Sequence, residues 1–66
     1  MTPLARNIHT AIARRGLTVT AAAVECGIDR VTMYRYLADQ RTPPMSRLET
    51  IAAALGTTVS KLTKGM

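Results

Sequence analysis

Four arginines in the middle of the chain offer the clearest chemistry in this sequence. They are Arg30, Arg35, Arg41 and Arg47, and Asp39 is the only acid between the first and the last of them. A guanidinium group can donate two parallel hydrogen bonds to O6 and N7 of guanine, or it can pair with a phosphate. We therefore expect residues 30–47 to meet an anionic partner.

The composition of the whole chain favours the same class of partner. The 66 residues contain nine Lys and Arg against four Asp and Glu, which gives a net charge of +5 and a pI near 10.4. For such an excess of basic residues, nucleic acid is the binding partner we expect first, and a membrane surface is the second. So short a chain has little room for both a core and a deep substrate pocket, so we expect no enzyme.

The sequence predicts neither a metal site nor a membrane anchor. Cys26 is the only cysteine and His9 the only histidine, so there is no disulfide and no ligand cluster, and we expect a packed thiol. No run approaches the roughly 20 apolar residues of a membrane-spanning helix. A signal peptide contains an uninterrupted apolar stretch. The first residues of this chain lack one, because polar side chains occur at Arg6, Asn7, His9 and Thr10. A cytoplasmic protein is expected.

Turn-forming residues divide the chain into five short segments with helical spacing. The turns fall at Gly16, Gly27, Thr42-Pro43-Pro44 and Gly56. The expected helices span roughly residues 2–15, 19–26, 30–38 and 43–55, with one or two further turns after residue 58. No segment alternates apolar and polar residues as a strand does. The prediction is one all-α domain, a compact five-helix unit over residues 1–66.

Capping residues and apolar stripes support these boundaries. The expected N-caps, whose side chains accept the free amide hydrogens of a first turn, are Thr2, Thr18, Asp29 and Thr58. In the third segment an apolar stripe at spacing i, i+3, i+4 must pack on neighbouring helices, because so short a helix is not stable alone. Its members are Met33, Tyr36 and Leu37, and Met45 in the fourth segment is also assigned to the core.

The join between the second and third segments, residues 19–38, is the most informative feature. Ala23 is small enough for another helix to cross close to it, and Gly27 permits a tight turn. Ile28 can plug the core from inside that turn, and Asp29 can cap the next helix. This order is typical of two helices that meet at a large angle through a turn of a few residues.

With these residues in order, the sequence resembles the helix-turn-helix DNA-binding domains of the lambda-repressor and Cro family, also called the xenobiotic-response-element family. The similarity runs from Leu4 to about Leu62. It includes Arg41-Thr42-Pro43, and the stretch from Leu48 to Gly56 resembles the fourth helix of the family. One departure is Val19, which stands where many members have a glutamine that contacts phosphate.

The resemblance implies that residues 30–38 form a recognition helix in the major groove of DNA. The base-contacting candidates are Arg30, Val31, Thr32, Tyr34 and Arg35. The phosphate-contacting candidates are Thr18, Thr20, Arg41, Thr42 and Arg47, the two threonines taking the place of the missing donor at Val19. Two assignments stay open at this point, since Val31 could instead complete the core and Tyr34 could be ordinary surface.

The function implied is a sequence-specific regulator of transcription that binds double-stranded DNA. A free-standing domain of this kind resembles a Cro-like repressor of phage or prophage type, which occludes a promoter in a bacterial cell or an infected host cell. We expect a homodimer on a palindromic operator, with no cofactor and no small-molecule effector. The dimer surface would involve Val59, Leu62 and Met66.

Two other classes of protein remain as alternatives. The first is a protein-interaction module of the same fold, such as an antitoxin-like or anti-repressor adaptor, which the valines at positions 19 and 31 favour slightly. The second is a cationic peptide that acts on membranes. This second class is disfavoured because the Gly and Pro residues break the chain into helices that suit a globule.

Overall fold

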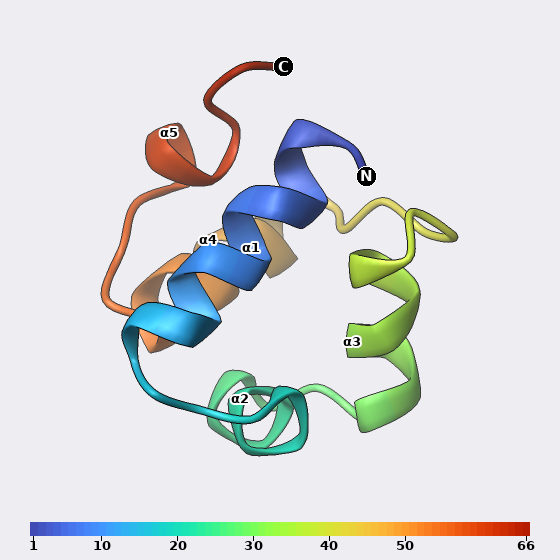
Figure 1. The fold of residues 1–66 in the computed structure, drawn as a ribbon, viewed down its shortest axis with the longest axis vertical. Helices are drawn as coiled ribbons and strands as arrows, with labels where there is room; N and C mark the ends of the chain where they lie inside the picture. Colours follow the sequence, from blue (N-terminus) through green and yellow to red (C-terminus); the bar gives the residue numbers. More distant parts are fainter.

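The computed structural model describes all residues, 1–66, and contains five α-helices (Figure 1). They are α1 (Pro3–Arg14), α2 (Val19–Cys26), α3 (Arg30–Leu37), α4 (Met45–Ala54) and α5 (Val59–Leu62). The prediction of an all-α fold with five helices is confirmed, and each boundary lies within two residues of its expected place.

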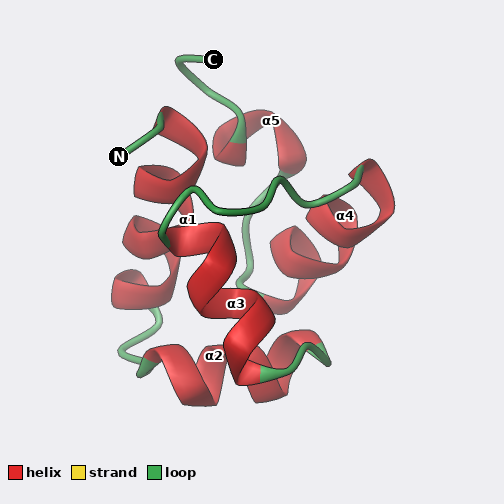
Figure 2. Cartoon of the chain, turned by 90° about the vertical axis from the view of Figure 1, so that its right-hand side faces the viewer, coloured by secondary structure: helices red, strands yellow, loops and turns green.

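The helices pack around α1, which crosses the middle of the molecule (Figures 1 and 2). α1 packs on α3 and on α5, and α2 packs on both α3 and α4. Figure 1 shows α3 and α5 on opposite sides of α1. None of the five helices combines the length and the apolar character that a membrane crossing requires.

One hydrophobic core joins all five helices. Its largest completely buried side chains come from four different helices, and they are Ile8, Met33, Ile51 and Leu62. Ala22 and Ala23 of α2 are also buried, and α2 packs on both α3 and α4. Cys26 is a packed thiol as expected, and burial raises its pKa above the ordinary value.

The helix starts follow the capping pattern of the sequence. The hydroxyl groups of Thr2, Thr18 and Thr58 and the carboxylate of Asp29 each accept a backbone N–H from the first turn of the helix that follows. These four predictions are confirmed. Pro44 precedes α4 without a side-chain cap, and its carbonyl accepts the backbone N–H groups of Arg47 and Leu48 at 2.9 and 3.0 Å.

Two expectations from the sequence are wrong. The sequence places Met45 in the core, but this first residue of α4 is 59% exposed. Leu62 was a candidate for a dimer surface but is 1% exposed. The short α5 turns Leu62 into the core, and Val59 is only partly buried against it.

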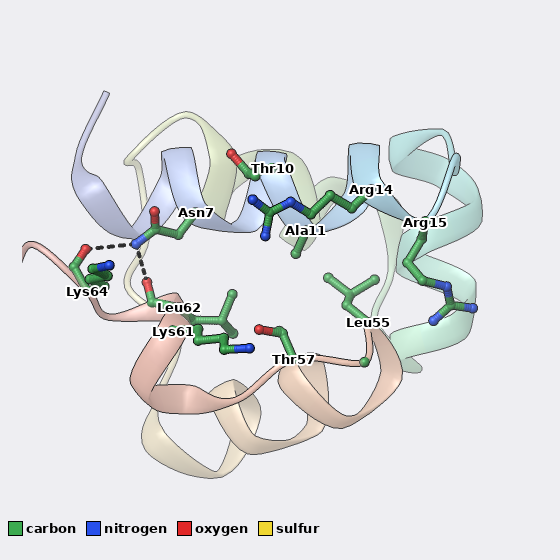
Figure 3. Close-up of a pocket in the computed structure, with 11 residues that line it drawn as sticks. Asn7, Thr10, Ala11, Arg14, Arg15, Leu55, Thr57, Lys61, Leu62 and Lys64 are labelled. Carbon is green, nitrogen blue, oxygen red and sulfur yellow. Dashed lines mark hydrogen bonds between the residues drawn. The ribbon is translucent and has the colours of Figure 1, made fainter.

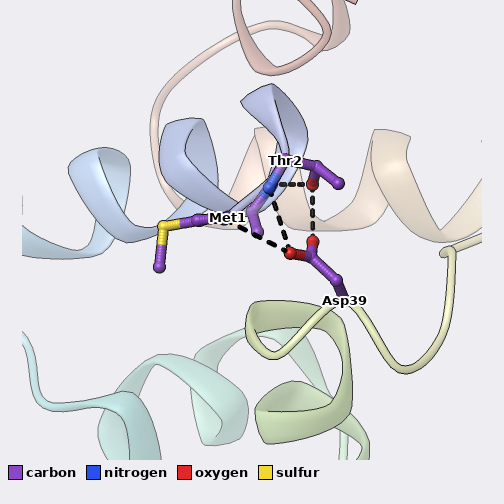
Figure 4. Close-up of polar contacts among 4 residues, drawn as sticks. Met1, Thr2 and Asp39 are labelled. Atoms are coloured by element: carbon purple, nitrogen blue, oxygen red, sulfur yellow. Dashed lines mark hydrogen bonds and ion pairs between the residues drawn. The ribbon is translucent and has the colours of Figure 1, made fainter.

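A clamp ties the loop after α3 to the start of α1 (Figure 4). The Thr2 hydroxyl donates to Asp39 Oδ1 at 2.6 Å, and the Thr2 backbone N–H donates to Asp39 Oδ2 at 3.0 Å. The same hydroxyl oxygen accepts the N–H of Ala5. Asp39 has a φ of 61°, in the left-handed region that aspartate tolerates better than most residues. The clamp therefore fixes the left-handed turn at Asp39, and it also joins the loop after α3 to the start of α1.

The clamp should make stability depend on acid pH. The hydrogen bonds from Thr2 favour the charged carboxylate and lower the pKa of Asp39 below its ordinary value of 3.8. A carboxyl group whose pKa is lowered by folding stabilises the protein fully above its ordinary pKa. That contribution is lost as the pH falls through the lowered pKa of the folded state.

We therefore expect Asp39→Asn to flatten the loss of stability as the pH falls below the ordinary carboxyl pKa of 3.8. The measurement is urea denaturation followed by circular dichroism at a series of pH values, with Thr2→Ala expected to flatten the same limb. Glu49→Gln, at an exposed position of α4, is the control and should leave the slope unchanged. Equal slopes in Asp39→Asn and wild type would contradict the role of the clamp.

Candidate nucleic-acid interface

A rigid junction sets the position of α3 against α2. Gly27 closes α2 with a φ of 68°, a left-handed conformation that costs glycine little. The Ile28 N–H donates to the carbonyl of Ala23 at 2.9 Å, and the Ile28 side chain is buried in the core. The two helices are thus joined by a short turn that is anchored from inside.

Asp29 organises the first turn of α3. Its Oδ2 accepts the backbone N–H of Thr32 at 3.0 Å, and its Oδ1 accepts the Thr32 hydroxyl at 2.6 Å. These bonds favour the carboxylate and lower the pKa of Asp29, with a smaller contribution from the charge of Arg35. Because the Thr32 hydroxyl proton is used here, its oxygen is left to act as an acceptor toward any ligand.

α3 divides into a buried and an exposed face. Met33, Tyr36 and Leu37 face the core, as the apolar stripe predicts. The exposed residues occupy positions i, i+1, i+4 and i+5, which fall on one side of a helix, and they are Arg30, Val31, Tyr34 and Arg35. Val31 is 53% exposed and Tyr34 is 51% exposed, so Val31 does not complete the core.

α3 stands at the front of the molecule in Figure 2, with α2 below it and the loop of residues 38–44 above. Thr18 and Thr20 are exposed at the start of α2, and Arg41 and Thr42 are exposed in that loop. The Thr18 oxygen caps α2 and accepts the N–H of Ala21, which leaves its proton free to donate.

The loop after α3 is held in place by the end of that helix. The backbone N–H groups of Gln40 and Arg41 both donate to the carbonyl of Arg35, at 2.9 and 3.3 Å.

The sequence analysis identified Asp39 only as an acid and missed its part in the clamp with Thr2. An aspartate directly after a helix, where a left-handed residue is common, was the available signal.

The arginines of this surface have no acidic partner. The ion pairs of the structure are Arg15 with Glu25, at 3.2 Å, and the amino terminus with Asp39, at 4.0 Å. Arg30, Arg35 and Arg41 are exposed and Arg47, on α4, is partly buried, and none of them is in an ion pair. The surface of α3 and the adjoining loop therefore presents arginines that are not held in any ion pair within the chain.

Comparison with known proteins identifies the family of the chain. Residues 4–63 match a family model described as a helix-turn-helix domain. Neither the curated proteins nor the solved structures contain a significant match. The match covers all five helices except the first residue of α1, and it includes the α2–turn–α3 junction with the Gly27 turn and the exposed face of α3. The chain belongs to this family of helix-turn-helix domains.

Proposed function

We propose that the chain is a sequence-specific regulator of transcription that binds double-stranded DNA through α3, with residues 1–66 as one domain and residues 19–38 as its bihelical motif. The observation that carries the proposal is the exposed face of α3. This face carries Arg30 and Arg35, neither of which is in an ion pair, and the opposite face of the helix is buried in the core.

The side chains on that face suit the floor of the major groove, which is wide enough to admit a helix. Arg30 and Arg35 would each donate a pair of hydrogen bonds to guanine. Val31 would pack against a thymine methyl group, and the Tyr34 hydroxyl would reach a base edge or the backbone. Thr32 would take part as an acceptor, for example from the amino group of adenine or cytosine.

Phosphate contacts would fix the register of α3 on the duplex. Thr18 and Thr20 would donate from the start of α2, and Arg41 and Thr42 from the loop after α3. Arg47 is the weakest of these candidates, because its side chain is partly buried on α4.

A single domain makes few base contacts, so we infer a homodimer that reads two half-sites of a palindromic operator about 34 Å apart. With Leu62 buried, Val59 and Met66 are left as candidates for the contact between the copies. Binding would exclude polymerase from a promoter, as in a Cro-like repressor of phage or prophage type. This mechanism needs no cofactor and would act in the cytoplasm of a bacterial cell or an infected host cell.

One observation favours a second candidate, a protein-interaction module. Val24 on α2 and Val31 on α3 are 75% and 53% exposed, and Val19 has no side-chain donor for phosphate. Exposed apolar side chains of this kind suit contact with a protein. A gel-shift assay with random duplex at low salt separates the two candidates, since an adaptor would hardly retard the DNA.

Replacing Arg35 tests the assignment of base contacts. We expect Arg35→Ala to lower affinity for the preferred site, selected from random duplexes, by about 1–3 kcal/mol and to relax the preference at one base pair. Arg6→Ala, at an exposed arginine of α1, is the control. Competition binding measures both effects, and an unchanged affinity and preference would place base recognition elsewhere.

Replacing Arg41 tests the assignment of phosphate contacts. Arg41→Ala should weaken binding to all sequences by a similar factor, because a phosphate carries no sequence information. The slope of log K against log salt should become shallower by about one unit, since one fewer counterion is released. Titrations at several salt concentrations give that slope, and a loss confined to the preferred site would contradict a phosphate role.

A further inference from the structure

On the side of the molecule away from α3, α1 and the last part of the chain enclose an open groove of about 530 Å³ (Figure 3). One wall is α1, and the other wall is formed by the turn after α4 together with α5. Ala11, Leu55 and Leu62 lie along its base. Nothing in the sequence indicates this groove, because its walls come from opposite ends of the chain.

Hydrogen bonds between distant segments close both ends of the groove. At one end Asn7 Nδ2 donates to the carbonyls of Leu62 and Lys64, each at 2.9 Å. At the other end Arg15 donates to the carbonyl of Ala54 at 2.7 Å and to Glu25 at 3.2 Å. The walls are therefore held at a set separation, and the groove has a limited length.

The charge that lines the groove is of one sign. Arg14, Lys61 and Lys64 line it without any ion pair, and none of the four acids of the chain does so. In Figure 3 the guanidinium of Arg14 lies over one wall, while the ammonium of Lys61 and the hydroxyl of Thr57 face it from the other. A cleft lined by one sign of charge concentrates its field on a counter-ion.

We propose that this groove binds a small, multiply charged anion that bears phosphate groups. Its volume lies within the range of about 300–1,000 Å³ that is usual for small-ligand sites. Arginine offers a phosphate two hydrogen bonds and lysine a point charge, and the Thr57 hydroxyl, which has no hydrogen-bond partner in the fold, adds a donor. The closed ends suit a short molecule better than a polymer that would pass through.

The site is independent of the proposed DNA contact. It lies on the α1–α5 side, whereas α3 lies on the opposite side of α1 (Figure 1). An anion could therefore occupy the groove with or without DNA on α3. The sequence predicts no small-molecule effector, whereas the groove offers a site for one.

The test is a titration of the ¹⁵N-labelled full chain with inorganic pyrophosphate, followed by NMR chemical shifts. Amides of residues 10–14 and 57–64 should move, and pyrophosphate should bind at least about fivefold more tightly than inorganic phosphate because it spans both walls. Arg14→Gln and Lys61→Gln should each weaken binding about fivefold. Arg6→Gln, a cation of α1 outside the groove, is the matched control and should bind as wild type does.

Two results would overturn the proposal. If Arg6→Gln weakens pyrophosphate binding as much as Arg14→Gln does, the anion is held only by the net charge. If a short DNA duplex shifts the groove amides while pyrophosphate does not, the groove is a nucleic-acid surface. Thermal unfolding checks that each variant is folded. Arg14→Lys keeps the charge but loses the paired donors, so it should bind more weakly than wild type and more tightly than Arg14→Gln.

Discussion

The left-handed turn at Gly27, closed by the burial of Ile28, is the constraint on which the remaining structure depends. The turn sets the angle between α2 and α3, and the isoleucine makes that angle part of the core. Any residue with a Cβ is strained at such a φ. If the two helices joined in another way, the apolar stripe of α3 would lose its neighbours and its arginines would lose a defined direction.

α3 shows how a short helix gains a fixed outer face. Eight residues are too few for a stable helix in isolation, so its conformation comes from the burial of Met33, Tyr36 and Leu37 and from the Asp29 cap. The other side chains of α3 must then point toward solvent. The exposure of Arg30 and Arg35 is in this sense a consequence of packing on the other side of the helix.

Three of the four acids of the chain are used within the fold, and most cations are left without an ion pair. Asp29 caps α3, Asp39 clamps the loop to α1, and Glu25 pairs with Arg15. Arg15 is the only groove cation in an ion pair, whereas Arg14, Lys61 and Lys64 of the groove and the arginines of α3 have no paired acid. The net charge of +5 is thereby presented on two opposite sides of a small molecule.

The sequence by itself determined the local structure. Helix starts follow from caps such as Thr18 and Asp29, whose hydrogen bonds span three residues, and the faces of α3 follow from helical spacing. Much of the candidate nucleic-acid interface could thus be predicted, because it lies on one short helix and the turn before it.

Only the tertiary structure decided what distant residues do together. Spacing alone put both Met45 and Leu62 on apolar positions, and the packing of α4 and α5 exposed the first and buried the second. The clamp joins residues 2 and 39, and the groove is closed by a bond between residues 7 and 64. Such contacts depend on the relative placement of whole helices, which is settled by how their side chains fill a shared core and not by any pattern within one segment.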